Sequence, residues 1–534
     1  MADTTKEQQR SELHKAIWSA ADRLRGSVDG WDFKQYVLGM LFYRFISENL
    51  ATHLDALVHA SGDADFSYVD FDDEAAEMAR EDTVASKGFY ILPSQLFCNV
   101  VKRAHEDADY LANLNEHLEA NFKAIETSAM GHASEGDLKG LFDDIDVNGR
   151  KLGETVPKRN EKLLALMDCI ASIDFGSAYE DTVLDPFGDA MEFLMTMYAS
   201  NAGKSGGEFY TPQEVGTVLA RIALDGRKEV YRAYDACCGS GGLLCAIARE
   251  TRTKGEDGRW VNHVTGGLFG QEINLTSYNL ARMNMFLHDI NYDRFDIALG
   301  DTLLDPQHWD YEPFDAILSN VPFSIDWQPD NPTLQDDPRF TPAGVMAPQH
   351  NADLAFTMHM LSWLAEDGTA AIVQFPGALY RSGKEAKIRE YMVKNNYVQA
   401  VIALPSNLFF GTGIATAVIV LKKSKTDTDI LFVDASAEFV KQGKDNKLTD
   451  ANIDAICKLY FDRDEVQYKT KLVPNTEVIA NGSNLSPSAY VEREDTREKV
   501  DIKALNAELR QIVAEGNALR EKVDAIVADL EGGE

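Results

Sequence analysis

Apolar residues recur at helical spacing through the first 170 residues of the chain. Residues 10–25 and 31–50 each carry apolar side chains three and four positions apart, and similar patterns cover 106–126 and 160–170. This spacing places the apolar side chains on one face of an α-helix. Strand patterns are scarce in this region. The sequence therefore predicts an N-terminal helical domain at residues 1–170.

From about residue 203 the pattern changes to short apolar runs that alternate with helical stretches. The candidate strands are residues 229–235, 267–272, 295–299, 314–320, 369–375, 398–404 and 415–421. Strands separated by helices are typical of βαβ units around a mostly parallel sheet. We therefore expect an α/β domain at residues 171–480. Ligands of such sheets bind at the carboxyl ends of the strands.

The last segment returns to a helical pattern with a regular repeat. Apolar residues from Ile502 to Leu530 alternate at intervals of three and four, and only Gly516 interrupts them. Such a seam is typical of a helix that packs against a partner helix. Residues 481–534 are predicted to form a helical tail. Its seam is expected to cover either helices of another subunit or the N-terminal helices of the same chain.

Composition narrows the class of function. The 534 residues include 86 acidic and 52 basic side chains, which gives a formal net charge of −34. Because phosphate contacts need a dense positive surface, tight binding of nucleic acid by the chain alone is disfavoured. Two local groups of basic residues are still candidates to face a duplex. They are Arg381, Lys384, Lys387 and Arg389, and Lys422, Lys423 and Lys425.

The sequence also favours a cytoplasmic protein. No apolar run approaches the roughly 20 residues that a membrane span needs, and the first ten residues do not resemble a signal peptide. The six cysteines are too sparse for a disulfide scaffold. Cys237, Cys238 and Cys245 lack the spacing of zinc ligands, so we expect no metal site.

The clearest chemical signal follows the first candidate strand. That strand ends in Asp235 and leads through small residues into Gly239-Ser240-Gly241-Gly242 and then a helical run. Glycines let the backbone approach a ligand, and free N–H groups at a helix N-terminus donate hydrogen bonds to it. Because the turn is not GxGxxG, it indicates a cradle for a nucleotide or nucleoside and does not specify a dinucleotide.

Acidic residues follow the next two candidate strands. Glu272 ends one strand, where a carboxylate can accept hydrogen bonds from both hydroxyls of a ribose. Asp301 follows the other strand, in a position suited to contact an adenine amino group. Either acid alone is better explained as a helix cap or a solvated carboxylate. Two acids at consecutive strand ends, after a glycine turn, favour a nucleoside site.

A candidate catalytic turn follows the strand at 314–320. This strand brings Asn320 to the carboxyl edge of the sheet, where Pro322 stiffens the turn and Phe323 presents an aromatic face. The amide oxygen and a neighbouring backbone carbonyl would hold an exocyclic amine for in-line attack on a methyl group while Phe323 stacks on the base. Taken alone, the tetrapeptide is also consistent with an ordinary strand-to-loop turn. The glycine-rich segment 203–213 fits a lid over a nucleoside and lacks the Walker A pattern.

The order of these motifs, EFYTP, DACCGSG, QE, GDT and NVPF, resembles the amino-methyltransferases of the gamma arrangement. With its helical flanks, including WDFKQYVLGMLFYRFISENL, the chain resembles the modification subunit of type I restriction–modification systems over nearly its whole length. The resemblance implies a Rossmann-like, S-adenosylmethionine-dependent methyltransferase domain that methylates N6 of adenine in DNA at specific sites. It also implies a DNA-specificity subunit docked through Ile502–Leu530, a second copy of this chain, a restriction subunit carrying the motor and nuclease, and double-stranded DNA.

The same resemblance implies roles for individual residues. Asn320, Pro322 and Phe323 would form the catalytic turn around a flipped adenine. The residues implied to bind S-adenosylmethionine are Glu208, Phe209, Tyr210, Thr211, Pro212, Gln213, Asp235, Gly239, Ser240, Gly241, Gly242, Glu272 and Asp301. Phe323 stands where cytosine C5 enzymes have a nucleophilic cysteine, so covalent catalysis is not expected.

Two positions depart from the family pattern. Val321 replaces the first proline of the catalytic turn, and Ala236-Cys237 stands where the family usually has Pro-Ala. The role required at position 321 is a backbone carbonyl, which valine also supplies. Activity is therefore expected to survive.

Two other functions are left open by the sequence. One is a non-catalytic S-adenosylmethionine-binding assembly subunit of a defence complex. The other is a methyltransferase that acts on RNA or on a protein amide. The long N-terminal helices and the C-terminal repeat favour the DNA complex.

Overall fold

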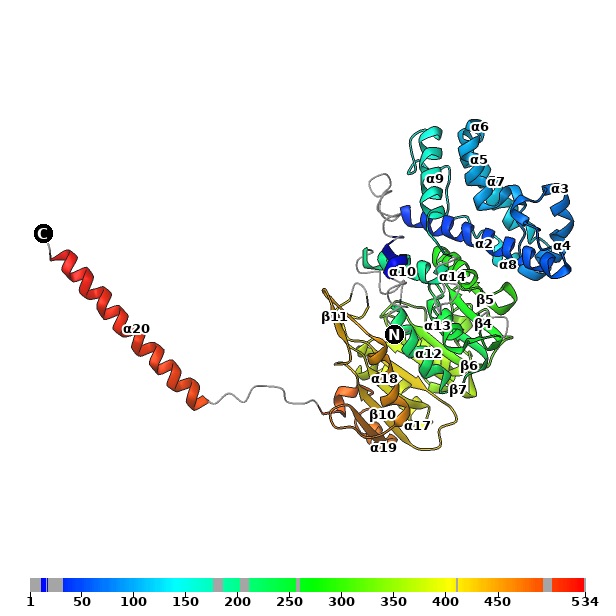
Figure 1. Cartoon of the computed structure of the whole chain (residues 1–534). Helices are drawn as coiled ribbons and strands as arrows, with labels where there is room; N and C mark the ends of the chain where they lie inside the picture. The colour runs from blue at the N-terminus through cyan, green and yellow to red at the C-terminus, as the bar shows by residue number, and fades with distance from the viewer. Residues whose placement is uncertain are drawn as a thin grey trace. The chain divides into compact units, whose positions relative to one another are not determined.

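The computed structural model describes residues 11–15, 17, 32–175, 186–201, 211–255, 260–409, 412–492 and 502–532. The chain divides into two compact units, Met1–Val491 and Glu492–Glu534, and each is described by itself (Figure 1). Within the described residues, none of the helices combines the length and the apolar character needed to cross a membrane.

The first part of the larger unit is helical, as its spacing predicts. Its α-helices are α2 (Asp32–Ser61), α3 (Asp73–Ala76), α4 (Arg80–Lys87), α5 (Phe97–Glu106), α6 (Ala108–Ala112), α7 (Leu114–Ser128), α8 (Glu135–Leu138) and α9 (Val156–Ala171). Helix α2 extends well beyond the predicted end at residue 50. Its Tyr43 packs edge-to-face against Phe97 of α5 and Phe122 of α7, which ties three helices into one core.

Two predicted helices need qualification. The stretch 106–126 contains two helices, α6 and α7, because Asp107 starts the first by accepting hydrogen bonds from the N–H groups of Asp109 and Tyr110. Asn113 then separates the two helices. In the stretch 10–25, residues 11–15 and 17 are helical, and the others lie outside the described residues.

A nine-stranded sheet forms the second part of the larger unit, in the order β13-β10-β8-β9-β7-β6-β1-β4-β5. Its strands are β1 (Val230–Asp235), β4 (Val264–Glu272), β5 (Phe295–Leu299), β6 (Phe314–Asn320), β7 (Leu364–Gln374), β8 (Val398–Ala403), β9 (Ala417–Leu421), β10 (Asp429–Asp434) and β13 (Thr470–Pro474). All seven predicted strands are present, and β10 and β13 are additional. The α/β fold is confirmed.

Two small ribbons lie outside this sheet. They are β2 (Thr253–Lys254) with β3 (Trp260–Val261), and β11 (Val440–Gln442) with β12 (Asp445–Lys447). The remaining α-helices of the unit are α10 (Pro186–Asn201), α12 (Gln213–Leu224), α13 (Gly242–Thr251), α14 (Leu275–Leu287), α15 (Asp353–Trp363), α16 (Pro376–Tyr380), α17 (Lys384–Lys394), α18 (Asp450–Asp462) and α19 (Asn475–Ala480). Short 3-10 helices are η1 (Tyr68–Asp70), η2 (Glu77–Ala79), η3 (Pro93–Gln95), η5 (Tyr292–Arg294), η6 (Pro332–Leu334), η7 (Thr341–Ala343) and η8 (Pro487–Ala489).

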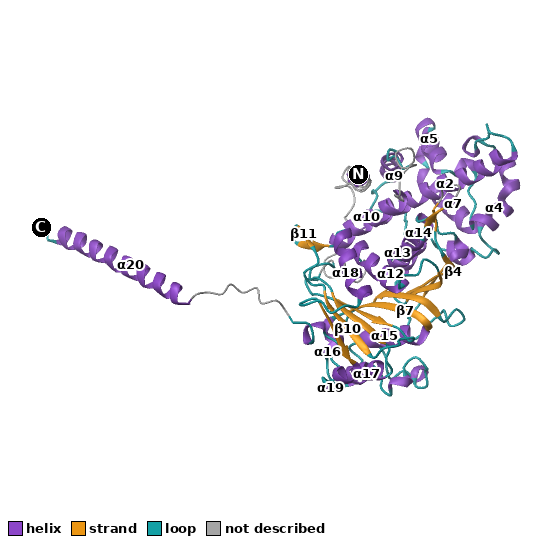
Figure 2. Ribbon diagram, turned by 60° about the horizontal axis from the view of Figure 1, so that its bottom comes forward, coloured by secondary structure: helices purple, strands orange, loops and turns teal. Residues whose placement is uncertain are grey.

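Helices cover both faces of the sheet (Figure 2). Successive strand residues point to opposite faces. Ala233 and Ala316 therefore pack in the core beneath α12, α13 and α14, whereas the adjacent Tyr234 and Ile317 pack in a second core with α15 and α17. Since both faces are buried, the strands read as nearly continuous apolar runs.

The strand directions gather the predicted site residues at one edge. β1 pairs in parallel with β4 and β6, β4 with β5, and β6 with β7, so all five carboxyl ends lie together. The strand order reverses at β1, because β4 and β5 continue to one side and β6 and β7 to the other. A reversal of this kind opens a crevice at the carboxyl edge.

The described residues of the smaller unit, 492 and 502–532, contain one helix, α20 (Ile502–Glu531). It matches the predicted helix, and none of its residues is buried. The eight apolar residues of the seam are between 57% and 76% exposed: Ile502, Leu505, Leu509, Ile512, Leu519, Val523, Ile526 and Leu530.

Candidate active site

The loop after β1 depends on glycine. Gly239 and Gly241 have φ values of +53° and +78°, a region that other residues rarely adopt. A Cβ on Gly241 would lie 2.8 Å from Cε of Met285 and 3.4 Å from Cα of Ala281. The Gly241 N–H closes the turn on the Cys238 carbonyl at 2.7 Å, and α13 begins at the next residue. The N-terminus of α13 therefore lies at the carboxyl end of β1.

Asp235 stabilises this loop through a hydrogen bond to its backbone. Its side chain is fully buried at the end of β1, and Oδ1 accepts a hydrogen bond from the Cys237 N–H at 3.1 Å. Burial raises the pKa of Asp235 to about 7, although the nearby Ser319 hydroxyl and the Cys237 N–H oppose the shift. This contact is the one expected of a residue that organises the loop.

Glu272 connects the end of β4 to the same loop. Its Oε2 accepts from the Gly239 N–H at 3.0 Å, and its Oε1 accepts from the Asn274 N–H at 2.8 Å. Burial raises the pKa of Glu272, and these two backbone donors act against the rise. The next residue, Ile273, is 69% exposed and places a large apolar side chain beside the carboxylate. A polar group and an apolar surface therefore adjoin each other at this strand end.

Asp301 shapes the loop after β5. Its Oδ1 accepts hydrogen bonds from the N–H groups of Leu303 and Leu304 at 2.9 and 3.2 Å, so this oxygen acts as a cap, the alternative explanation of the acid. The Thr302 hydroxyl donates to the Ala236 carbonyl at 2.6 Å, which joins this loop to the one after β1.

Asn320 ends β6 and is tied to the segment that precedes α12. Its Nδ2 donates to Oγ1 of Thr211 at 3.1 Å, although the two residues are 109 positions apart in the chain. The bond fixes the orientation of the amide, because Oδ1 must point away from the side that Nδ2 occupies. Two motifs that are distant in the sequence therefore meet at one point of the carboxyl edge.

The other residues of the predicted catalytic turn are stabilised by contacts with the segment after β7 and with α15. Phe323 is half-buried, and its ring lies 5.8 Å from the ring of Phe375, the residue that follows β7. The Ser324 N–H donates to Oδ2 of the buried Asp353 at 3.2 Å. Val321 is 1% exposed and packs into the core, so its backbone carries the turn while its side chain fills space.

A buried arginine that sequence reasoning missed supports the loop after β5. Arg339 is 1% exposed and donates to the backbone carbonyls of Thr302 and Leu303 at 2.9 and 2.7 Å. Asp337 balances its charge through Nε and Nη2. Because Arg339 belongs to the segment after the catalytic turn, it links that segment to the predicted cofactor loop.

The same arginine sets the proton position on a buried histidine. Its Nη1 lies 3.2 Å from Nδ1 of His359, and a guanidinium can only donate, so Nδ1 accepts. The ring proton is therefore on Nε2, which lies 2.9 Å from the hydroxyl of Tyr234, the neighbour of Asp235. Burial lowers the pKa of His359 well below its usual value, which keeps the ring neutral. No local signal in the sequence indicates this network, since its members come from three separate segments.

Three predicted residues, Glu208, Phe209 and Tyr210, lie outside the described residues. Thr211, Pro212 and Gln213 are described and lead into α12. The structure thus brings Thr211, Asp235, the glycine turn, Glu272, Asp301 and Asn320 to the same edge of the sheet.

The prediction that the two basic groups face a duplex is wrong for the buried Arg389, and the three lysines at 422, 423 and 425 are only partly exposed. Arg389 is buried and donates to the carbonyls of Ala378, Arg381 and Ser483. Lys423 and Lys425 also donate to backbone carbonyls, and Lys422 pairs with Asp225. These cations are used to satisfy carbonyl groups and a carboxylate within the fold. Lys384 and Lys387 are exposed.

Comparison with known proteins identifies the family. Residues 182–499 match the family described as N-6 DNA methylase, and residues 13–170 match the one described as HsdM N-terminal domain. The chain is 44% identical to the type I restriction enzyme MpnII methylase subunit of Mycoplasma pneumoniae, over 98% of this chain and 97% of that protein. It is 28% identical to the MjaVII methylase subunit of Methanocaldococcus jannaschii, over 99% of this chain and 85% of that one.

A solved structure agrees with these matches. The type I restriction-modification system methyltransferase subunit of Streptococcus thermophilus aligns with a TM-score of 0.79 and 33% identity, over 90% of this chain and 100% of that one. The chain therefore belongs to the N-6 DNA methylase family, alongside the methylase subunits of type I restriction enzymes.

Proposed function

We propose that this chain is the modification subunit of a type I restriction–modification complex and methylates N6 of an adenine in duplex DNA, with S-adenosylmethionine as methyl donor. The observation that carries the residue assignment is the hydrogen bond between Asn320 and Thr211 at the carboxyl edge. It places the predicted catalytic amide against the predicted cofactor segment, beside the glycine turn of β1. Family membership supplies the reaction class, and this geometry supports the proposed site.

The residues of the edge fit the cofactor. A Cβ at Gly241 would collide with Met285 of α14, so glycine at this position lets the turn pack closely while it presents its N–H groups. The N-terminus of α13 supplies N–H donors beside Gly239–Gly242. Glu272 would hold the ribose hydroxyls, and the exposed Ile273 provides an apolar face for a flat ring. Asp301 would lie near the adenine, and Thr211–Gln213 would close the other side.

Asn320 would position the target amine. The bound cofactor supplies an electrophilic methyl group, so the amine needs orientation and no strong base. Since Nδ2 is directed at Thr211, Oδ1 is the atom of this side chain suited to accept an N–H of the amine. A second N–H would meet the backbone carbonyl of Val321. Both bonds aim the nitrogen lone pair at the methyl group, while Phe323 stacks on the flipped base. The amine proton then leaves to water.

The proposal includes the organisation of the complex. Residues 1–170 would form the helical domain, 171–480 the methyltransferase domain and 481–534 the docking tail. The exposed seam of α20 would pack against helices of a DNA-specificity subunit. Two copies of this chain would flank double-stranded DNA, and a restriction subunit would join them. The target sequence would be read by the specificity subunit.

The test is methyl transfer by the assembled complex. The chain is co-purified with its specificity subunit and incubated with radiolabelled S-adenosylmethionine and DNA. Asn320→Ala should reduce the transfer rate by about a thousandfold or more while leaving the cofactor dissociation constant within about threefold, because the amide acts on the amine. Sequencing of modified bases in cells with and without the gene gives the methylated adenine.

Two outcomes favour the other functions. If the complex binds S-adenosylmethionine and transfers no methyl group to any DNA, with wild-type and Asn320→Ala chains behaving alike, the chain is an assembly subunit. If RNA or protein receives the label and DNA does not, the substrate assignment is wrong.

A further inference from the structure

The ribbon of β11 and β12 stands apart from the main sheet and has no role in the proposed chemistry. Val440 pairs with Lys447, and Gln442 pairs with Asp445, in an antiparallel register. Gly443 at the turn has a φ of +65°, which suits a tight hairpin connection. All of its residues are exposed except Asn446, at 5%.

Asn446 fastens the ribbon to the carboxyl edge of the sheet. Its backbone N–H donates to the Asn407 carbonyl at 2.9 Å, and its Nδ2 donates to the Ser406 carbonyl at 2.7 Å. Ser406 and Asn407 follow β8. β8 and β7 are both antiparallel to β9, so β8 runs in the same direction as β7 and β6. The ribbon is therefore fixed at the edge that carries Asn320.

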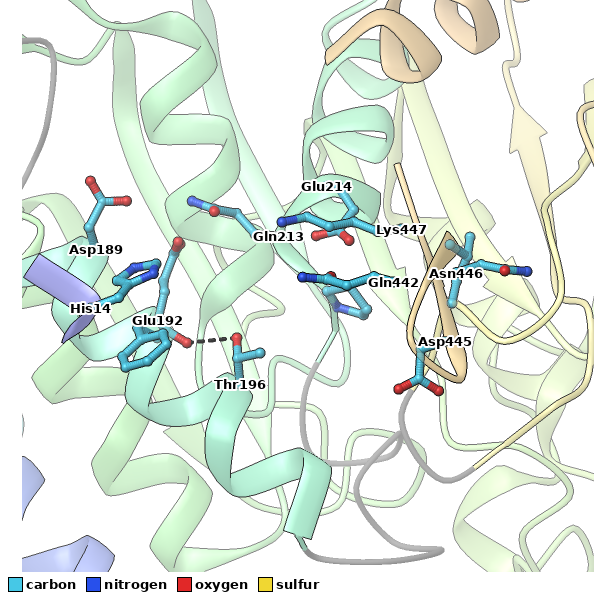
Figure 3. Close-up of a pocket in the computed structure, with 13 residues that line it drawn as sticks. His14, Asp189, Glu192, Thr196, Gln213, Glu214, Gln442, Asp445, Asn446 and Lys447 are labelled. Carbon is cyan, nitrogen blue, oxygen red and sulfur yellow. Dashed lines mark hydrogen bonds between the residues drawn. The ribbon is translucent and has the colours of Figure 1, made fainter. Parts of the chain in front are cut away.

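A cavity of about 440 Å³ separates the ribbon from the start of α12. Gln442 and Lys447 point from the ribbon toward Gln213 and Glu214 on the opposite wall (Figure 3). Pro212 also lines this cavity and directly follows Thr211, the hydrogen-bond partner of Asn320. The ribbon thus stands across one cavity from the segment that orients the catalytic amide.

The ribbon is locally basic in a chain with a net charge of −34. It contains Lys441, Lys444 and Lys447 against one carboxylate, Asp445, all exposed. Lys447 faces Glu214, and its charge opposes the rise that burial causes in the pKa of Glu214. Lys441 and Lys444 are the two lysines on β11 and in the turn.

Asp189, Glu192 and Glu214 line the cavity together with Lys447, whereas Lys441 and Lys444 are not among the residues that line it. Glu438, which precedes the ribbon, is paired with Lys469 at 2.7 Å. Lys441 lies 5.6 Å from the ring centroid of Phe439, an apolar support that adds no negative charge. A compact cation on a flexible stem suits a phosphate group.

We propose that this ribbon contacts the backbone of duplex DNA beside the flipped adenine, with Lys441 and Lys444 meeting phosphate groups. The inference rests on the proposed function and names where the substrate touches this chain. Phosphate contacts fix the position of a duplex and carry no sequence information. The ribbon therefore anchors the DNA at the catalytic edge without choosing the target.

The test compares lysine variants in the intact complex with its specificity subunit. DNA binding is measured at several salt concentrations, and methyl transfer is measured in parallel. K441A/K444A should lower the slope of log affinity against log salt by about 2, since each phosphate contact contributes roughly 0.9. The affinity for DNA of any sequence should fall roughly tenfold at moderate salt. The kcat at saturating DNA and the affinity for S-adenosylmethionine should not change.

Two controls separate the ribbon from charge in general. K458A/K471A removes the same charge from exposed lysines on α18 and on the edge strand β13, and it should leave the slope unchanged. K441R/K444R keeps both charges and should preserve the slope.

The inference is overturned if K441A/K444A and K458A/K471A change the slope equally or not at all. Loss of the specificity subunit from the K441A/K444A complex would also overturn it, since the ribbon would then contact protein. The proposed function fails separately. A wild-type complex that methylates no DNA, and whose binding slope still depends on Lys441 and Lys444, would refute the enzyme and leave the ribbon contact standing.

Discussion

The carboxyl edge of the sheet and the C-terminal helix each depart from the usual arrangement of apolar residues inside and polar residues outside. The edge holds polar side chains inside the fold, and the helix carries apolar side chains on its surface. At the edge, Asp235 is buried and Glu272 is partly buried, and both accept hydrogen bonds from backbone N–H groups. In α20, apolar side chains such as Leu509 and Ile512 are exposed. The polar groups of the first region are hydrogen-bonded within the larger unit, whereas the apolar seam of α20 is not covered by the described residues of its own unit. Polar groups held by backbone N–H groups are satisfied by the chain itself, whereas an exposed apolar seam is typical of a surface that binds a partner.

The largest effect is expected from substitutions in the apolar seam of α20. L509D/I512D places two carboxylates in the proposed contact, and an unpaired charge is costly to bury, so affinity for the specificity subunit should fall more than a hundredfold. A507D/A514D adds the same charges to the opposite face of α20 and should leave assembly intact. Co-purification measures both. Equal assembly by the two variants would show that the seam is not the docking surface.

The next prediction replaces one glycine by alanine in each of the two regions. Gly241→Ala introduces a Cβ against Met285 at a φ of +78°, so affinity for S-adenosylmethionine should fall about thirtyfold or more. Gly516→Ala meets open space in α20 and should stabilise the helix by about 1 kcal/mol. Calorimetric titration with the cofactor and thermal unfolding measure the two effects. Unchanged cofactor affinity in the first variant would remove the glycine turn from the site.

A smaller effect concerns pH. The pKa of Asp235 is raised from 3.8 to about 7 by burial, so the folded chain holds a proton that the unfolded chain releases. The stability this proton contributes is complete below pH 4 and is lost as the pH rises through 7. Between pH 5 and pH 8 the wild-type free energy of unfolding should fall by about 2 kcal/mol more than that of Asp235→Asn.

Denaturant unfolding at the two pH values measures this difference. Glu74→Gln, at an exposed carboxylate, is the matched control and should follow the wild type. If Asp235→Asn and the wild type lose stability in parallel, Asp235 does not carry the proton.

The smallest effect is expected at Val321. Val321→Pro keeps the backbone carbonyl and restores the proline of the family pattern, so methyl transfer should be unchanged or raised by up to about threefold. The side chain is buried, and the altered packing should cost about 1 kcal/mol. Initial rates with the assembled complex measure the first effect. Loss of transfer in Val321→Pro, with cofactor binding retained and Val321→Ala active, would show that the turn requires the valine backbone.

Much of the fold was predictable because its signals are local. Most residues of the seven predicted strands are apolar and buried, and the regular repeat of α20 is complete within its own segment. The edge strand β13 shows a weaker pattern, since only Thr470 and Val473 are buried in it. Helix α2 exceeds its predicted end because its apolar face continues through Leu54.

The site was predictable in part for the same reason. Glycines, strand-end acids and Asn320 lie in short motifs, so their types and order are visible in the sequence. The role of Arg339 could not be predicted from the sequence, because its partners Thr302 and His359 are distant in the chain. Charge alone misled at Arg389, because a sequence does not show which cations are bound to carbonyl groups. Local sequence patterns therefore do not reveal contacts between segments that are distant in the chain.

The exposed seam of α20 has a consequence for gene dosage. Chains made in excess of their partner carry eight large apolar side chains in the open, and surfaces of this kind promote self-association and degradation. Under the proposed assembly, the amount of specificity subunit then sets the amount of modification subunit that persists. The genes of the two subunits would then need matched expression. Excess modification subunit would be degraded before it could methylate DNA without a specificity subunit.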